Sequence, residues 1–339
     1  GVVNGAARFP LQASATLLVV ALALAAMLWL TLRPSPGEWR YTLRLGPWQT
    51  ELGAFATWRV VTHPLALRLL EGRALPTPLG RVQLQAGAAA GEWVAVCAPC
   101  TLPIAALGEA PVRTASAERG SHPRGQGEKR GTFALGEPAR AVRGRFTLRM
   151  EAASAALRFQ DIDTPMADAY ALFDRVIPEL RYARIDGRLQ LDGALTLPAG
   201  EWTLAPVIEG FRVAGLGTEL LLDAEPACGR RMAGTGFGRW LPKAVIAAED
   251  QRFYEHTGFD LAEITAAWSQ QRPGGGSTLS QQLAKLLFTG DAPGHVRKLR
   301  ELLYAVELDR TLGKARVLHL YLSMAPWGQG QCGAHAAAL

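Results

Sequence analysis

The sequence predicts a multi-domain chain in three parts: an apolar N-terminal transmembrane helix, a β-rich middle of α+β type, and a mainly α-helical C-terminal domain. Three observations support this prediction. A run of 22 uncharged residues lies near the N-terminus, apolar and polar residues alternate through the middle, and helical spacing of apolar residues begins at Gly229. With 339 residues, 49% of them hydrophobic, the chain is long enough for two or three domains.

The N-terminal segment 1–37 contains the uncharged run Leu11–Leu32, which Arg8 and Arg33 bracket. At ~1.5 Å of rise per residue, such a helix spans a hydrocarbon core of ~30 Å. A signal peptide would have a shorter apolar region and a small-residue cleavage site, which Arg33–Pro36 does not resemble. We therefore expect an uncleaved anchor at about 11–32. Cations stand on both sides of it, so its charge pattern leaves the orientation open.

The middle is expected to divide into a β-rich segment at 38–114, a linker at 115–131 and a β-rich accessory module at 132–228. The linker is polar, basic and rich in glycine, as connecting segments are. We interpret the module as a scaffold or a partner-binding unit. The strands expected from alternation are Arg81–Gln85, Glu92–Cys97, Arg143–Met150 and Ala156–Phe159.

Two further elements are expected in the accessory module. Met166–Leu180 has the apolar spacing of one amphipathic helix. Arg184–Leu197 contains two Asp-Gly pairs, at Asp186 and Asp192, and Asp-Gly between alternating residues is a strong signal for a β-hairpin. The sequence therefore predicts a hairpin in this stretch.

Cysteine spacing and charge limit the chemistry. Cys97 and Cys100 form a lone C-x-x-C without the βαβ context of a redox site or the second ligand pair of a zinc site, so we expect a local disulfide or two plain thiols. The net charge of +6 would suit nucleic acid, anionic lipid or a phosphorylated substrate. No basic helix with interleaved aromatic residues favours nucleic acid.

The first chemistry-bearing motif is Ala244–Asp260. Pro242 suits the first helical position, and Gly258 can end a helix in a left-handed cap. The apolar run Ala244–Ala248 predicts a helix buried on several sides, with Glu249 at its end. Burial would raise the pKa of Glu249 and make it a general base or acid near neutral pH. A surface carboxylate at a helix end is an equally weighted interpretation.

The second motif begins with Gly274–Gly276, which permit a tight turn and the close approach of a ligand. Ser277 is expected to be the N-cap of the next helix. Thr278, Gln281 or Gln282, and Lys285 would lie on one face of that helix, an arrangement suited to a phosphate-bearing ligand. The alternative is a capped surface helix.

The third motif, Arg297-Lys298-x-x-Glu301, lies in a helix expected at Gly294–Leu312, and another helix is expected at Lys314–Ser323. On a helix, Glu301 is close to both cations. The plain interpretation is an exposed salt-bridged helix in which each pair contributes ~0.2–0.5 kcal/mol. The functional interpretation places a second carboxylate and two cations beside the first site.

Residues 235–339 resemble the peptidoglycan glycosyltransferases of family 51, which are the transglycosylase domains of class A penicillin-binding proteins and the monofunctional transglycosylases. The resemblance implies a hexosyltransferase with a lysozyme-like α-helical domain at 229–339. It implies polymerisation of lipid II on the periplasmic side of the bacterial inner membrane, with a single-pass anchor. The motifs that carry it are Glu249-Asp250-x-x-Phe253-x-x-His256-x-Gly258, Gly275-Gly276-Ser277-Thr278-x-x-Gln281-Gln282-x-x-Lys285, Arg297-Lys298-x-x-Glu301 and Lys314–Leu322.

The resemblance also implies roles for individual residues. Glu249 would be the general base that takes the proton from the acceptor sugar hydroxyl. Glu301 would hold the departing pyrophosphate, directly or through a divalent Mg or Mn ion, and Lys285, Arg297 and Lys298 would offset its charge. The other residues expected to bind substrate are Asp250, Phe253, His256, Ser277, Thr278, Gln281 and Gln282. The implied partners are lipid II, the growing glycan strand, the cytoplasmic membrane and other cell-wall synthesis proteins.

The sequence departs from the family pattern at three positions. Leu286 and Ser323 stand where the family usually has Asn, and Cys332 stands where it has Tyr. The domain is expected to be incomplete at its C-terminus. Two alternatives remain: a lysozyme-like glycan hydrolase, which also uses two carboxylates, and a non-catalytic envelope scaffold or lipid-carrier binder.

Overall fold

The computed structural model describes residues 19–338, apart from 21, 24, 46–47, 78–79, 89–91, 101–111, 115–127, 225–235, 271–275 and 291–293. The predicted anchor therefore lies partly outside the described residues. Residues 25–32 within it are helical. Among the described residues, no helix has both the length and the apolar character needed to cross a membrane.

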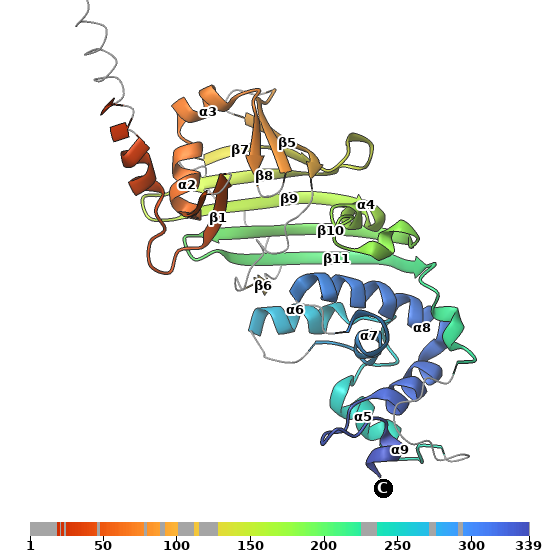
Figure 1. The fold of residues 1–339 in the computed structure, drawn as a ribbon. Helices are drawn as coiled ribbons and strands as arrows, with labels where there is room; N and C mark the ends of the chain where they lie inside the picture. The colour runs from red at the N-terminus through yellow and green to blue at the C-terminus, as the bar shows by residue number, and fades with distance from the viewer. Residues whose placement is uncertain are drawn as a thin grey trace, which may run out of the picture.

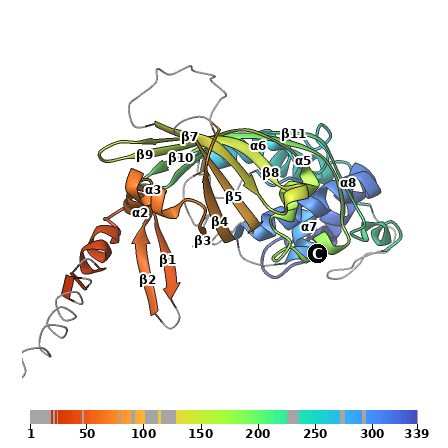
Figure 2. The same cartoon turned by 90° about the horizontal axis from the view of Figure 1, so that it is seen from above.

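After the N-terminal helix, the chain forms a small antiparallel pair, β1 (Arg40–Leu45) and β2 (Trp48–Gly53), followed by α2 (Ala54–Val61) and α3 (Pro64–Leu70). Figure 2 shows this group at one end of a large sheet and the C-terminal helices at the other. Ala54 at the start of α2 packs with Leu195 and Leu197 of the sheet in a small apolar core.

One nine-stranded sheet contains strands from both predicted β-rich segments, in the order β3-β4-β5-β7-β8-β9-β10-β11-β6. The β5–β7 and β11–β6 pairs are parallel, and the other neighbouring pairs are antiparallel. All four strands expected from alternation lie within observed strands. The bounds are β3 Ala74–Thr77, β4 Gly80–Ala86, β5 Glu92–Cys100, β6 Val112–Thr114, β7 Glu128–Leu135, β8 Val142–Met150, β9 Ala155–Pro165, β10 Arg184–Leu197 and β11 Glu201–Ala214.

Three local predictions in this region are settled or changed. Cys97 and Cys100 form a disulfide, one of the two expected states. Residues 128–131 of the expected linker belong to β7, and the rest of that segment lies outside the described residues. The predicted helix Met166–Leu180 is wrong in extent, because α4 covers only Met166–Ala171 and a 3₁₀ turn, η3, follows at Pro178–Arg181.

The predicted hairpin within Arg184–Leu197 is wrong, because these residues form the single strand β10. The two glycines of the Asp-Gly pairs instead lie where the strand register shifts. Gly187 has φ +113° beside a shift against β11, and Gly193 lies at a shift against β9. A Cβ on Gly193 would collide with the ring of Phe159. The glycines therefore permit bulges and close packing rather than a reversal of the chain.

The C-terminal part is helical, as predicted, and lies against strand β11 (Figure 1). Its longest element, α8 (Gly294–Met324), is broken at Gly313, which has φ 73° and ψ 162°. The break separates the two helices expected at 294–312 and 314–323. The remaining elements are η2 (Pro138–Arg140), η4 (Thr218–Leu221), α5 (Leu241–Glu249), α6 (Leu261–Gln270), α7 (Leu279–Ala284), the π turn η5 (Lys285–Thr289) and α9 (Ala334–Ala337).

The sheet and the helices share one hydrophobic core. Phe211 and Val213 from β11 belong to the same cluster of buried side chains as Leu283 from α7 and Leu303 from α8. Phe211 also meets Phe259, which lies just before α6, edge to face at 5.8 Å between ring centroids. The helical part is therefore packed directly on the accessory module.

Candidate active site

Glu249 is the last residue of α5, which begins with Leu241 and Pro242. The expected burial of this helix is wrong. Val245 is buried, but Ala244, Ala247, Ala248 and Glu249 are exposed. A nine-residue helix at the edge of the domain inserts only one narrow face into the core. Burial therefore does not supply the desolvation that we expected at Glu249.

The Glu249 side chain is instead oriented by hydrogen bonds. Gln282 of α7 donates from Nε2 to Glu249 Oε2 at 3.1 Å. The Tyr321 hydroxyl of α8 donates to Gln282 Oε1 at 2.8 Å. Burial, together with the nearby charge of Glu249, raises the pKa of Tyr321 to about 12, so its hydroxyl keeps its proton at neutral pH. Tyr321 therefore orients the side-chain amide of Gln282, and this amide orients the carboxylate of Glu249.

Thr278, and not Ser277, is the N-cap of α7. Its hydroxyl accepts from Gln281 N at 3.2 Å, and Gln281 Oε1 accepts from Thr278 N at 3.0 Å. This reciprocal capping box buries both side chains. Ser277 is thereby left outside the helix, where its hydroxyl accepts from Lys298 Nζ at 2.6 Å. The prediction of the cap was one residue early.

Glu301 is 1% exposed and lies between two cations of its own helix. Lys298 Nζ donates to Glu301 Oε2 at 2.7 Å, and Arg297 Nε lies 3.1 Å from Oε1. Lys298 itself is 46% exposed, so it presents charge to solvent while it holds Glu301. The plain expectation of an exposed salt-bridged helix is therefore wrong for the carboxylate.

The first and third motifs are joined through α7. Gln282 Nε2 donates to Glu249 and also lies 3.4 Å from the Ser277 carbonyl. Ser277 accepts from Lys298, and Lys298 donates to Glu301. A continuous chain of polar contacts thus connects the exposed carboxylate with the buried one. The structure brings together, from three separate motifs, side chains that the sequence marked as candidates.

Several other candidates are buried and hold the turn after α5. Asp250 accepts from His256 Nε2 at 3.0 Å and from Leu279 N at 2.9 Å, which ties this turn to α7. Phe253 is 0% exposed. The Thr278 hydroxyl donates to the carbonyl of Gly258 at 2.6 Å. These contacts favour a supporting role for the buried candidates.

Asp309, which sequence reasoning did not single out, and Lys314, the first residue of the fourth motif, complete this support. Asp309 of α8 accepts from Gly258 N at 2.5 Å and from the Ser280 hydroxyl at 2.7 Å. Lys314 pairs with Asp309 at 2.5 Å and lies 4.5 Å from the centre of the Phe253 ring. The signal available in the sequence was their place on either side of Gly313, where the helix breaks.

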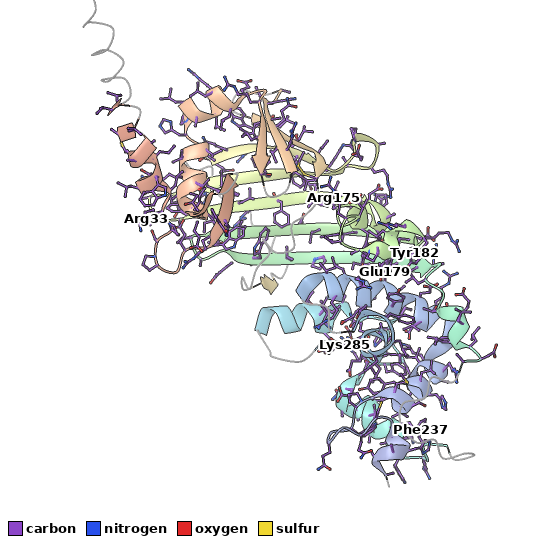
Figure 3. All side chains as sticks on the ribbon, viewed as in Figure 1. Arg33, Arg175, Glu179, Tyr182, Phe237 and Lys285 are labelled. Carbon is purple, nitrogen blue, oxygen red and sulfur yellow. A yellow bond between two sulfur atoms is a disulfide. The ribbon has the colours of Figure 1, made fainter. Side chains whose placement is uncertain are left out.

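Lys285 lies where α7 gives way to the π turn Lys285–Thr289. It is partly exposed, and its ammonium has no ion-pair or hydrogen-bond partner among the described residues. Single π turns occur often at functional sites. Figure 3 labels Lys285 beside α7. It is therefore a cation available to a ligand.

The residues at this site do not fit a protein-held divalent metal. In the part of the chain that the structure describes, no group of three or more His, Cys, Asp or Glu side chains is placed to hold an ion. Both oxygens of Glu301 already face Lys298 and Arg297.

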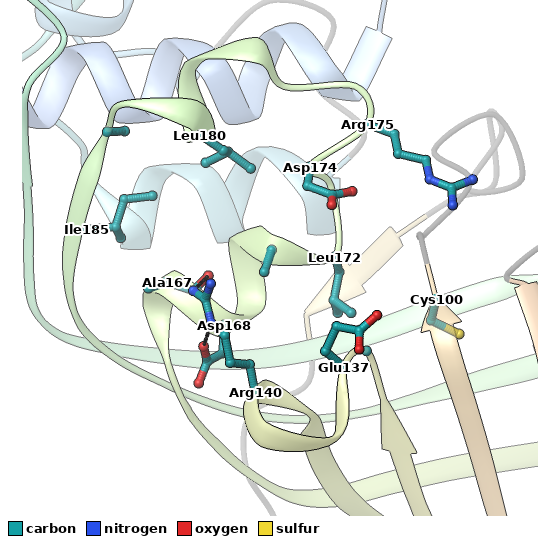
Figure 4. A pocket seen from close by; sticks show the side chains of 13 residues that line it. Cys100, Glu137, Arg140, Ala167, Asp168, Leu172, Asp174, Arg175, Leu180 and Ile185 are labelled. Atoms are coloured by element: carbon teal, nitrogen blue, oxygen red, sulfur yellow. Dashed lines mark hydrogen bonds and ion pairs between the residues drawn. The ribbon is translucent and has the colours of Figure 1, made fainter.

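Two cavities lie away from these carboxylates. One, of about 480 Å³, lies between η2, α4 and the start of β10, where Arg140 pairs with Asp168 at 2.7 Å (Figure 4). The other, of about 520 Å³, is bordered by Lys243, Ile246 and Tyr254 on α5 and the turn after it. Neither is lined by Glu249 or Glu301.

Comparison with known proteins agrees with the motifs. The family model described as Transglycosylase matches residues 231–339. A biosynthetic peptidoglycan transglycosylase of Nitrosomonas eutropha is 48% identical over 103 residues, which are 29% of this chain and 42% of that protein. Proteins of the same name from Thiobacillus denitrificans and Laribacter hongkongensis are 43% and 37% identical over 102 and 126 residues.

The match to the last of these covers 35% of this chain and 55% of that protein, and the match to the Thiobacillus protein covers 29% and 44%. The chain thus spans about half the length of these relatives, or somewhat less. The matched region contains all four motifs and begins before α5. Residues 231–339 therefore form a transglycosylase domain of glycosyltransferase family 51.

Proposed function

We propose that this protein is a membrane-anchored peptidoglycan glycosyltransferase that polymerises lipid II into glycan strands. Its substrates are lipid II and the growing strand, and its catalytic domain acts on the periplasmic side of the bacterial inner membrane. The Cys97–Cys100 disulfide supports this location, because disulfides persist in oxidising compartments. The uncharged run at 11–32 would supply the anchor.

The observation that carries the proposal is the polar chain from Glu249 through Gln282, Ser277 and Lys298 to Glu301. Glycosyl transfer from a diphosphate donor needs a base at the acceptor and positive charge at the leaving group. Glu249 is an exposed carboxylate, and Lys298 and Arg297 are cations gathered at a buried one. This series of polar contacts links the candidate base, Glu249, with the cations Lys298 and Arg297 within one site.

In the proposed reaction, Glu249 takes the proton of the acceptor sugar 4-hydroxyl as that oxygen attacks the anomeric carbon of the donor. The bond between this carbon and the diphosphate breaks, and undecaprenyl pyrophosphate leaves with the electron pair. Gln282 donates to Oε2 of Glu249 and so holds this carboxylate in place. A general base contributes typically 10²–10⁴-fold to the rate.

The leaving diphosphate gains negative charge, which Lys298, Arg297 and Lys285 would stabilise. Glu301 would hold Lys298 and Arg297 in place rather than meet the phosphates itself, because it is buried beneath them. The N-terminus of α7 would stabilise the diphosphate less than its sequence predicts. The N–H groups of Leu279 and Gln281 are already taken by Asp250 and Thr278.

The same geometry argues against a glycan hydrolase. A retaining or inverting hydrolase needs two carboxyl groups that both reach the sugar. Glu301 is enclosed and paired with two cations, so it cannot serve as the second group. Binding of a pyrophosphate lipid without turnover would instead indicate the scaffold alternative.

The experiment is lipid II polymerisation by the full-length protein and its Glu249→Gln variant. We expect a rate loss of about 10²–10⁴-fold with the fold intact. Glu255→Gln is the matched control, since Glu255 is an exposed carboxylate on the next turn, and its rate should be unchanged. Full-rate polymerisation by Glu249→Gln would refute the assigned base. Failure of the unaltered protein to polymerise lipid II would refute the function.

A further inference from the structure

The accessory module contacts α8 on the turn that carries the third motif. In Figure 3, Glu179 and Tyr182 lie where the module meets this helix. Glu179 belongs to η3, in the connection between α4 and β10. It is 1% exposed although it carries a carboxylate. A buried carboxylate in a connecting segment needs a specific partner.

That partner is Arg300, which donates to Glu179 Oε1 from Nε at 2.8 Å and from Nη2 at 2.6 Å. The hydrogen bonds that Arg300 donates to Glu179 raise the pKa of Arg300, so the guanidinium keeps its charge. Glu179 Oε2 is buried and has no hydrogen-bond partner among the described residues. Within the part of the chain that the structure describes, the carboxylate therefore depends on Arg300 alone.

Arg300 immediately precedes Glu301 on α8. Consecutive residues on a helix project ~100° apart, since one turn contains 3.6 residues. Arg300 accordingly reaches the module, while Glu301 reaches Lys298 and Arg297. A rotation of this turn that loosens the contact between Arg300 and Glu179 also moves Glu301 and its contacts with Lys298 and Arg297.

Two aromatic contacts hold the same stretch. The Tyr170 hydroxyl of α4 donates to the Leu299 carbonyl at 3.2 Å. The Tyr304 ring stacks on Phe288 at 4.2 Å with an interplanar angle of 2°. Burial raises the pKa of Tyr304, and the charge of Glu179 raises it further. Phe288 lies in the π turn that begins with Lys285, so the contacted stretch of α8 also supports that cation.

We propose that Glu179 is a positioning residue for glycosyl transfer: by pairing with Arg300 it fixes the turn of α8 from which Arg297 and Lys298, held by Glu301, are presented to the diphosphate. This inference rests on the proposed function. It makes the β-rich module a working part of the enzyme rather than an attached scaffold. Misplacement of catalytic groups by about 1 Å can cost ~100-fold in rate.

The test compares Glu179→Gln with the unaltered full-length protein in steady-state polymerisation of lipid II. We expect kcat to fall about 10- to 100-fold and KM to change much less, because the cations act most strongly on charge that develops in the transition state. Asp163→Asn is the control. It removes an exposed ion pair of the same module, Asp163–Arg188 at 2.8 Å, and should leave kcat and KM unchanged.

A double-variant cycle separates positioning from general stability. Arg300→Gln should also lower kcat, and the double variant Glu179→Gln/Arg300→Gln should be no slower than the slower single variant. Multiplied losses in the double variant would overturn the proposal. Tyr170→Phe provides a milder probe that keeps the fold, and a fall of about 2- to 5-fold in kcat is expected from loss of one hydrogen bond.

Hydrogen exchange of peptides within 294–306 provides a readout independent of turnover. Glu179→Gln should speed exchange there, and Asp163→Asn should not. Unchanged exchange together with unchanged kcat in Glu179→Gln would overturn the proposal. If the unaltered protein does not polymerise lipid II, the proposed function fails. Faster exchange in Glu179→Gln would then show that the mechanical contact nevertheless holds, so the two failures are distinguishable.

Discussion

Replacement of Tyr321 by Phe tests whether Glu249 is held in place by a relay. The change removes one hydroxyl and leaves the buried ring, so packing on α8 is preserved. Gln282 Oε1 then loses its donor at 2.8 Å, and its amide is less firmly aimed at Glu249. The net contribution of such a hydrogen bond is about 0.5–1.5 kcal/mol. Because ~1.4 kcal/mol corresponds to tenfold, kcat should fall about 2- to 10-fold.

The assay is lipid II polymerisation with kcat and KM measured separately. KM should change little, because the Tyr321 hydroxyl contacts the enzyme's own Gln282. Gln282→Ala removes the hydrogen bonds to both Tyr321 and Glu249, so it should lower kcat more than Tyr321→Phe. Tyr254→Phe, which removes the hydroxyl of an exposed tyrosine, is the control. An unchanged kcat in both Tyr321→Phe and Gln282→Ala would refute the relay. A loss near 10⁴-fold in Tyr321→Phe would instead place this phenol in the chemistry itself.

The same tyrosine predicts a pH effect on stability. Its pKa is about 12 in the folded protein and about 10 when unfolded, so the folded state binds more protons between these values. Tyr321 thereby contributes up to about 2–3 kcal/mol to the free energy of unfolding. This contribution is fully present below pH ~10 and is lost as pH rises through ~12. Tyr321→Phe should therefore lose less stability over that window than the unaltered protein. Urea unfolding at pH 9 and pH 11 measures this difference.

The remaining predictions concern the cap and the cation. Thr278→Val should lower the free energy of unfolding by about 2–4 kcal/mol, because it leaves the buried Gln281 N and Gly258 carbonyl without hydrogen-bond partners. The control is Thr257→Val, at an exposed threonine. Equal losses of stability in the two variants would contradict the capping argument. Lys298→Met should lower kcat by about 10- to 100-fold and destabilise the fold by about 1–3 kcal/mol, because Glu301 keeps only Arg297. Lys243→Met, at an exposed lysine, should change neither kcat nor stability. A fully active Lys298→Met variant would show that Lys298 does not bind the diphosphate.

Local chemistry explains which parts of the fold were predictable. The two helices expected at 294–312 and 314–323 are separated at Gly313, whose positive φ glycine adopts without strain. The strands β4, β5 and β8 were expected because alternation has one simple structural meaning. The hairpin was predicted wrongly from the same kind of signal. Asp-Gly permits a turn, but Gly193 is required here by the ring of Phe159, which is more than thirty positions away.

Burial was the property that sequence could not supply at the site. The run Ala244–Ala248 is apolar, yet three of its alanines are exposed, so apolar composition did not predict the burial of the short helix α5. The depth of Glu301 was underestimated for the opposite reason. Its cations, three and four residues earlier on the helix, resemble a surface pattern, and the packing of α8 on α7 encloses the carboxylate.

The adjacent carboxylates Glu249 and Asp250 show how one motif serves two purposes. Asp250 has φ −160° and ψ 73°, which ends α5 and turns its side chain inward to His256 and Leu279 N. Glu249, one residue earlier, is still helical and points outward to Gln282. The buried acid thus ties the turn to α7, and α7 in turn carries the glutamine that aims the exposed acid. Buried residues of the motif would therefore also control the rate, because they determine where Glu249 stands.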